Sequence, residues 1–253
     1  MIASTIFRIL FASVFFYGTA ALGAQGQTVS AYNTQMSPPF VDDTQGLAKA
    51  LVDYFNADMK GEYHFVLQNI STENFDTHVL DKPSDFHGVA LFASPDFVQN
   101  SDRYLWSGLL FKDIDVLVFR TTNVPQRNKA DYLAGLRFGA SYGGRYPYVD
   151  ALIDEGKVFR EESQDDITNI EKLLAGKIDF TSIRLSTYKA LSSMTRYAGK
   201  IVSQPSPQSS DFQTRMFFGL QDAAVAARVE ITVARMNYDP KWQAVLRKYG
   251  IVM

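Results

Sequence analysis

The sequence predicts an α/β protein with two lobes, the second inserted within the first. From Gln27 onward, short β-rich runs alternate with helical patterns, as they do in α/β proteins with parallel strands. A polar segment that contains proline, residues 121–135, separates two such cycles and indicates a change of domain. A Pro/Ser-rich crossing at residues 204–210 then leads into a helical C-terminal part. The 253 residues are sufficient for one large or two modest domains.

Residues 1–24 have the order of regions found in a secretory signal peptide. One cation, Arg8, precedes an apolar run over residues 9–17, and small residues follow as far as Ala24. That run is too short for a membrane-spanning helix, and no later window approaches the roughly twenty apolar residues that a span needs. We therefore expect secretion with cleavage near Ala24, or alternatively Ala21. A retained membrane anchor is the other interpretation of this segment.

The composition excludes several kinds of chemistry. There is no cysteine, so a disulfide, a thiolate nucleophile and a cysteine-based metal site are ruled out. The formal net charge is -2, and it becomes -3 without residues 1–24 because Arg8 is the one charged residue there. A charge so close to balance indicates neither a nucleic-acid partner nor a basic membrane-binding face. We expect no cofactor.

The first cycle is defined by its turn residues and its apolar spacing. Two prolines and a glycine make residues 37–46 a loop. Apolar residues from Leu47 to Phe55 then recur at the spacing of one helical face. The apolar run after Trp106 indicates a buried strand. Strands are further expected at 28–33, 63–70, 86–92 and 113–122, and helices at 47–59 and 75–80.

The second cycle repeats the alternation of strand and helix. Residues 166–177 have acidic side chains early and lysine late, which matches the dipole of a helix. The last part of the chain is expected to be helical up to Met236 and again from Lys241. Strands are expected at 136–141, 158–163, 178–185 and 200–204, and further helices at 146–156 and 186–194.

Five motifs in this order resemble one family. They are "PPF" followed by a glycine and a helix, "SDRYLWSGLL", "LAGLRFGASYGG", "NIEKLLAGKIDF" and "YDPKWQAVLRKYGI". The chain resembles the bacterial extracellular solute-binding proteins of family 3, the polar amino-acid binding components of ABC importers, over nearly all of its length after residue 24. The resemblance implies a type II periplasmic-binding-protein clamp with a two-strand hinge. Lobe one would comprise residues 25–119 and 209–253, and lobe two residues 120–208.

The resemblance also implies ligand-binding residues in lobe one. In this family an arginine ahead of the hinge strand commonly pairs with the ligand's carboxylate, and that position matches Arg103. A guanidinium offers a planar fork to a carboxylate and stays charged. The alternative is a solvated turn pair with Asp102. Ser94 is the chief hydroxyl in the preceding segment, and Phe40 and Trp106 are expected either to wall the cleft or to belong to the core.

In lobe two, a glycine turn matches the family's turn at a helix N-terminus. Its backbone N–H groups would receive an anion, helped by the helix dipole; a plain strand-to-helix turn is the alternative. The residues expected to bind ligand in this turn are Tyr142, Gly143, Gly144 and Arg145. Arg184 falls within a residue of the position where members that bind α-amino acids often have an aspartate. A cation there predicts an anionic or dicarboxylate-like ligand, and a shift of one residue would make it a surface charge.

Catalysis has little support in the sequence. The three histidines, His64, His78 and His87, lack the spacing of metal ligands, and neither a G-x-S-x-G elbow nor a P-loop occurs. The adjacent carboxylates Asp165 and Asp166 are expected to begin a helix. Some periplasmic enzymes, such as cyclohexadienyl dehydratases, share the clamp fold, so the fold does not decide between binding and catalysis.

The motifs together predict a periplasmic, monomeric solute-binding protein that is not an enzyme. It would capture a small polar, carboxylate-bearing solute, such as an amino acid or related anion, and deliver it to an ABC permease. Two alternatives are open. One is the ligand-binding component of a sensory pathway that docks onto a membrane sensor, and the other is a periplasmic enzyme on the same fold.

Overall fold

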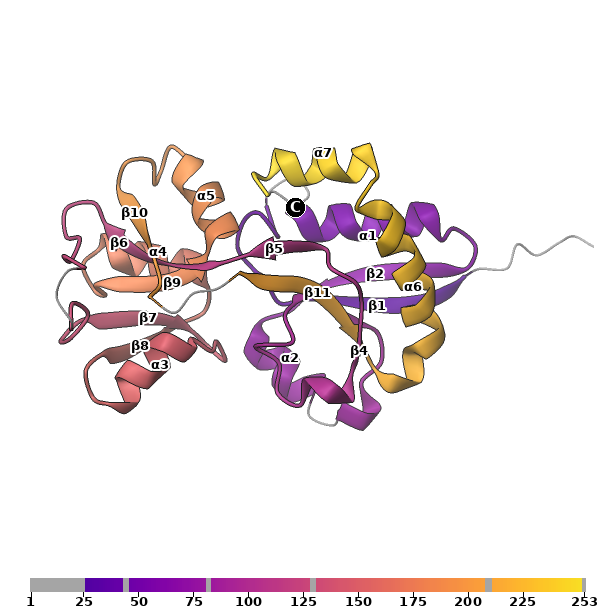
Figure 1. Cartoon of the computed structure of the whole chain (residues 1–253), viewed down its shortest axis with the longest axis horizontal. Helices are drawn as coiled ribbons and strands as arrows, with labels where there is room; N and C mark the ends of the chain where they lie inside the picture. The colour runs from indigo at the N-terminus through magenta and orange to yellow at the C-terminus, as the bar shows by residue number, and fades with distance from the viewer. Residues whose placement is uncertain (1–25, 43–45, 81–82, 128–130, 208–210, 252–253) are drawn as a thin grey trace, which may run out of the picture.

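The computed structural model describes residues 26–42, 46–80, 83–127, 131–207 and 211–251. The described chain forms two lobes that lie side by side along the long axis of the molecule, each built around one sheet (Figure 1). The expected signal peptide at residues 1–24 and the expected lobe boundary after residue 208 lie outside the described residues. Within the described residues, no helix has the length and apolar character needed to cross a membrane.

Lobe one is a sheet covered by helices, with strand order β2-β1-β3-β11-β4 and with β5 also paired to β11. β1, β2 and β3 are parallel to one another, whereas β11 runs antiparallel to β3, β4 and β5. Its strands are β1 (Gln27–Asn33), β2 (Tyr63–Asn69), β3 (Val89–Ala93), β4 (Leu105–Trp106), β5 (Phe111–Asp113) and β11 (Phe212–Phe218). Its helices are α1 (Gly46–Asp58), α2 (Thr72–His78), α6 (Ala223–Met236) and α7 (Pro240–Lys248).

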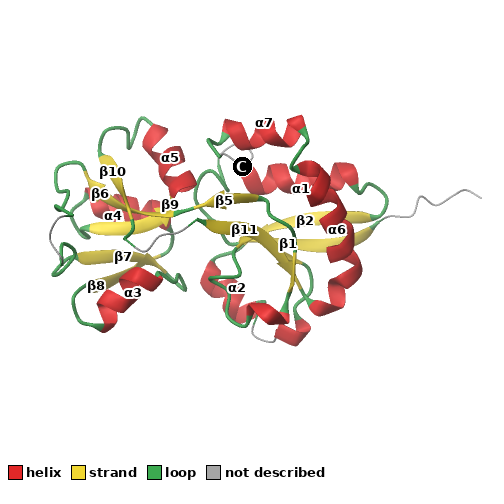
Figure 2. Cartoon of the chain, viewed as in Figure 1, coloured by secondary structure: helices red, strands yellow, loops and turns green. Residues whose placement is uncertain are grey.

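Lobe two has the strand order β10-β6-β9-β7-β8. β7 is parallel to β8 and β9, and β6 is antiparallel to β9 and β10. Its strands are β6 (Asp115–Arg120), β7 (Arg137–Ser141), β8 (Phe159–Ser163), β9 (Phe180–Arg184) and β10 (Ile201–Pro205). Its helices are α3 (Pro147–Asp154), α4 (Asp166–Leu174) and α5 (Leu185–Ser193), and Figure 2 shows them around the sheet.

The chain passes between the lobes twice, from β5 to β6 and from β10 to β11 (Figure 1). The first crossing comes earlier than the expected boundary after residue 119. β6 already pairs with β9 over Asp115 to Val118 and with β10 over Val116 to Arg120, so these residues belong to the sheet of lobe two. The carboxylate of Asp113 fixes this crossing, because it accepts hydrogen bonds from the backbone N–H of Ile114 and from the Ser186 hydroxyl, at 2.9 and 2.5 Å.

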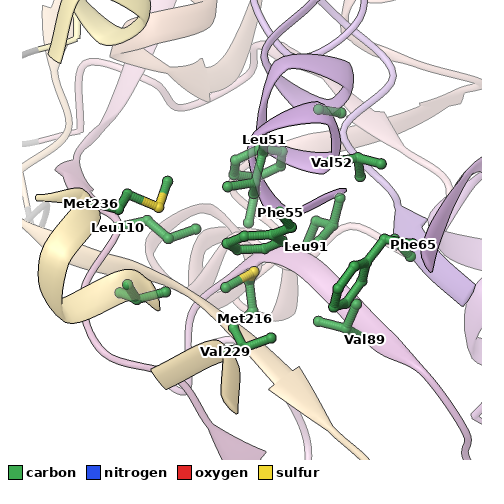
Figure 3. Close-up of a cluster of buried hydrophobic side chains, with 14 of the residues drawn as sticks. Leu51, Val52, Phe55, Phe65, Val89, Leu91, Leu110, Met216, Val229 and Met236 are labelled. Carbon is green, nitrogen blue, oxygen red and sulfur yellow. The ribbon is translucent and has the colours of Figure 1, made fainter. Parts of the chain in front are cut away.

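The core of lobe one lies between the sheet and helices α1, α6 and α7. Leu51 and Phe55 of α1 are fully buried and meet Leu91 of β3 and Met216 of β11 in the cluster of Figure 3. The helical spacing expected over 47–59 thus produces the packed face of α1. This core holds lobe one as one body, so that the ends of β1 and β3 are presented rigidly toward lobe two.

Candidate ligand-binding cleft

A cavity of about 390 Å³ lies between the lobes, and both lobes contribute to its walls. Its volume is within the range of small-molecule sites. Lobe one contributes the loop after β1, the first turns of α2, β3 with the loop that follows it, and residues of β11. Lobe two contributes Asp115 at the start of β6, the turn at 141–146, the start of α4 and the end of β9. The position between two lobes means that a bound molecule would touch both.

Charged side chains of both signs line this cavity, with carboxylates in excess. The described lining residues include Asp76, Asp115, Asp165 and Asp166 but only two cations, Arg145 and Arg184, with no lysine, glutamate or histidine among them. Four carboxylates against two guanidinium groups make the lining formally negative by two charges. This balance favours a ligand that carries a positively charged group.

Asp115 and Asp166 are held in a poorly hydrated part of the cleft. Burial raises the pKa of each carboxyl from 3.8 to about 6, although the charge of Arg184 opposes the rise in both cases. The Ser141 hydroxyl donates a hydrogen bond of 3.3 Å to Asp166. Asp165 instead caps α4, since its side chain accepts from the backbone N–H of Thr168 at 2.7 Å. These two half-buried carboxyls are therefore the groups whose charge a ligand would change most.

Asp76 and Arg145 face one another from opposite lobes. Burial raises the pKa of the Asp76 carboxyl, and the charge of Arg145 opposes that rise. Asp76 lies on α2 of lobe one, whereas Arg145 lies in the turn of lobe two, and both line the cavity. A zwitterionic molecule between them would meet a carboxylate on one side and a guanidinium on the other.

The turn at 141–146 is fixed by hydrogen bonds within lobe two. The N–H of Gly144 donates to the carbonyl of Ser141 at 2.8 Å, and the N–H of Tyr142 donates to the carbonyl of Ser163 at 2.9 Å. Arg160 donates to the carbonyl of Gly144 at 3.0 Å. Two N–H groups of this turn thus already have protein acceptors and are not offered to an anion. The expected anion site on the rest of the turn stays a prediction.

Aromatic rings form the apolar part of the wall. Phe75 of α2 and Phe217 of β11 line the cavity, with ring centroids 6.2 Å apart, and Tyr104 lies 4.7 Å from Phe217. Such rings exclude water and hold the apolar part of a ligand. Aromatic rings and charged groups thus line the same cavity.

No protein-family model matches the chain, and neither does any curated protein sequence. Solved structures do match it. An ancestral arginine-binding protein bound to arginine has a TM-score of 0.71 at 13% identity, covering 89% of this chain and 99% of that chain. The amino acid ABC transporter substrate-binding protein AbpA from Streptococcus pneumoniae, bound to L-arginine, has a TM-score of 0.70 at 12% identity, covering 88% and 94%. The GluR0 ligand-binding core from Nostoc punctiforme, in complex with L-glutamate, has a TM-score of 0.68 at 12% identity, covering 87% and 98%.

This chain has the type II periplasmic-binding-protein fold. The two-lobe clamp expected from the sequence motifs is thereby confirmed, and its structural neighbours include the class of amino-acid ABC transporter substrate-binding proteins that those motifs resemble. At these identities the likeness establishes the fold. The ligand has to be argued from the residues of this cleft.

Six of the nine residues expected to bind ligand line the cavity of this periplasmic-binding-protein fold. Ser94 is buried in its wall, and its hydroxyl lies 3.3 Å from the Asp96 carboxylate. Tyr142 is 48% exposed at the rim. The residues that line the cavity are Ser94, Tyr142, Gly143, Gly144, Arg145 and Arg184. Whether each contacts a ligand stays a prediction.

The other three expected residues lie elsewhere, and each needs correction. Arg103 is exposed at the end of the short helix Ser101–Arg103, outside the cavity wall to which Tyr104 belongs. Trp106 packs its ring against Phe217, with centroids 5.2 Å apart, and its indole N–H donates to the carbonyl of Ser101 at 2.8 Å. Phe40 is 1% exposed and belongs to the core of lobe one, so it is not on the cleft surface.

The sequence reasoning missed the buried carboxylates of the cleft. Asp166 had been assigned only the role of beginning a helix, and it does so while also lining the cavity. Asp115 stands directly before a run of four buried apolar residues. A carboxylate at the start of a buried strand is a usable signal, because such a strand end has few ways to hydrate a charge. Among the described residues, no group of three or more potential ligand side chains is arranged to hold a metal ion.

Proposed function

We propose that this chain is a solute-binding protein that holds a small polar solute, such as an amino acid, between its two lobes. The observation that carries the proposal is the cavity itself, which lies between the lobes of a type II fold and is lined by both carboxylates and guanidinium groups. In this role the chain would be a periplasmic monomer that presents its closed form to an ABC permease or to a membrane sensor.

The cleft chemistry favours a zwitterionic solute over a dicarboxylate. Arg145 offers a guanidinium to a ligand carboxylate, and Asp76 and Asp166 offer acceptors to a ligand ammonium group. The apolar part of the ligand would lie against Phe75 and Phe217. The expectation of a purely anionic ligand rested on Arg184, and the excess of carboxylates around that residue removes its support.

Ligand binding is tested by a thermal-shift screen of residues 25–253 against amino acids, dicarboxylates and amines. A solute that binds the native state at about a hundredfold excess over Kd stabilises it by about 2.7 kcal/mol, which raises the Tm by about 5–11 °C. We expect amino acids to give the shift. Arg145→Ala and Asp166→Asn should reduce it, and Arg103→Ala serves as the matched control because Arg103 lies outside the cavity. If no amino acid shifts the Tm, or if Arg103→Ala alone abolishes the shift, the proposal fails.

A second candidate function is acid–base catalysis on the same solute. The supporting observation is that Asp115 and Asp166 share one poorly hydrated cleft, where burial raises the pKa of each to about 6, a value suited to proton transfer near neutral pH. Incubating each stabilising solute with the protein and analysing it by mass spectrometry separates the two functions. An unchanged solute supports binding alone, whereas a product that disappears in Asp115→Asn supports catalysis.

A further inference from the structure

The side chain of Arg184 crosses the cleft from lobe two to lobe one. Arg184 is the last residue of β9, which belongs to the sheet of lobe two. Its guanidinium donates to the backbone carbonyl of Phe92 in β3 at 2.9 Å and lies 3.4 Å from the Thr214 hydroxyl in β11. Both acceptors belong to lobe one. The Arg184 side chain therefore connects the two lobes in the wall of the cavity.

Two aromatic rings of lobe one hold the same guanidinium in place. Its central carbon lies 5.4 Å from the centroid of the Phe40 ring and 5.0 Å from that of Phe212. Both rings belong to buried residues. A guanidinium that stacks on aromatic faces in a desolvated place gains more from the contact than one at an exposed place. Phe40, although not on the cleft surface, thus contributes to the cleft through Arg184.

The acceptor of Arg184 lies in an irregular part of β3. The pairing of β3 with β11 shifts register between Arg215 and Phe217, so that Leu91 and Phe92 together lie opposite one residue. Phe92 has a φ of 54°, in the left-handed region that a bulky residue rarely adopts. A bulge of this kind changes the direction of the backbone groups at a site. Backbone strain of this kind is found mostly at functional sites. Here the strained residue, Phe92, is the one whose carbonyl accepts the hydrogen bond from Arg184.

The charges of three carboxylates act on the guanidinium, Asp113 from lobe one and Asp115 and Asp166 from lobe two. Asp115 is the register partner of Arg184 between β6 and β9. Burial lowers the pKa of Arg184, whereas the charges of Asp113, Asp115 and Asp166 oppose that change. An arginine remains charged in this setting. The protein itself therefore supplies a cation, the guanidinium of Arg184, at the Phe92 carbonyl and near these carboxylates.

We propose that Arg184 acts as an intramolecular ligand, whose guanidinium bridges the two lobes and fills a cation subsite at the Phe92 carbonyl, next to the strand position of Asp115. Arg184 thereby determines which solutes the cleft accepts. Because its guanidinium occupies this subsite, the cationic group of a solute can pair only with the other carboxylates of the cleft. The effect of Arg184 on specificity rests on the proposed function, because it assumes that the cleft is the solute site. The bridge itself needs no solute.

The test is to remove the side chain and supply its head group in solution. Arg184→Ala should have a larger radius of gyration than wild type in small-angle scattering, because the connection between the lobes is lost. Methylguanidinium should restore the smaller radius and raise the Tm of Arg184→Ala by about 3–6 °C at about tenfold excess over its Kd. Wild type should not respond, because its subsite is occupied. Methylurea, which is similar in shape and uncharged, should have no effect on either protein.

Arg137→Ala is the matched control, since the Arg137 guanidinium binds Asp179 and the Gly176 carbonyl within lobe two. It should lose stability without a change in radius. If Arg184→Ala does not fold, Arg184→Lys replaces it. Lysine lacks the planar fork whose two nitrogens reach the two acceptors, so the radius should still increase. An unchanged radius in the folded variant, or an equal response of wild type to methylguanidinium, overturns the inference. These measurements use no solute, so a failed solute screen on wild type counts against the proposed function and not against the bridge.

Discussion

Replacing Asp115 by asparagine should stabilise the protein at pH 8 and leave its stability nearly unchanged at pH 4. Burial raises the pKa of the Asp115 carboxyl from 3.8 to about 6, against the opposing charge of Arg184. At 1.36 kcal/mol per pKa unit, a shift of about two units corresponds to roughly 3 kcal/mol. Because the folded pKa lies above the unfolded one, the contribution is complete below pH 4 and is lost as the pH rises through about 6. The charged form therefore destabilises the fold at pH 8.

Thermal unfolding of wild type and Asp115→Asn at the two pH values measures this contribution. At pH 8 the variant should unfold up to about 6–12 °C higher, the upper limit that 3 kcal/mol allows for a chain of this size. The gain falls short of that limit because Arg184 loses an attractive charge. Asp102→Asn, on the exposed turn, should change little at either pH. An equal Tm difference at pH 4 and pH 8 would refute the conclusion that desolvation outweighs the charge of Arg184 at the Asp115 carboxyl.

Three other predictions concern the frame that holds the cleft. Burial tends to raise the pKa of Asp58, but a hydrogen bond from Thr232 and two arginines of α6 lower it, so its stabilisation is present at pH 7 and is lost as the pH falls. Asp58→Asn should therefore cost about 1.5–3 kcal/mol at pH 7 in urea unfolding, and a cost that grows toward pH 3 would contradict this. Phe55→Ala, in the fully buried cluster of Figure 3, should cost about 3–5 kcal/mol in the same assay, and a cost below about 1 kcal/mol would show that the cluster is not packed. Gly144→Ala should displace the turn that carries Arg145, because a Cβ there would lie 2.7 Å from the Tyr146 hydroxyl. Loss of one charge-assisted hydrogen bond from Arg145 to the solute would weaken binding by about tenfold or more in calorimetric titration. An unchanged Kd would separate this turn from the site.

Helices were the elements that the sequence predicted best, because their signals are local. The expected helix at 166–177 contains α4, where Asp165 caps the first turn and Lys172 lies in the last. Strand β11, in contrast, was not expected. Its sequence follows the Pro/Ser-rich crossing, and Gln213 and Arg215 interrupt its apolar residues. What makes it a strand is pairing with β3, β4 and β5, which are far away in the sequence.

The cleft was predicted less evenly than the fold. The turn at 142–145 and Arg184 line the cavity, because strand ends in an open α/β sheet meet at one edge, and their contact with a ligand stays a prediction. Arg103 was misplaced because the segment after Ser94 continues into a short helix that leaves this side chain exposed. The path of such a loop depends on its packing. Motif spacing alone does not determine which of its side chains enters a cleft.

Two features of the cavity wall are unfavourable for folding, and neither the local sequence nor the fold explains them without the bridge made by Arg184. Phe92 adopts a backbone conformation that costs free energy, and Asp115 keeps a carboxyl where burial opposes its charge. Each feature is unfavourable alone, yet both are adjacent to the guanidinium of Arg184, which reaches across the cleft. Local conflicts of this kind are expected at functional sites. Because the bulge, the carboxyl and the guanidinium come from three strands in two lobes, their coincidence is accounted for by an interaction between the lobes, and not by the stability of either lobe.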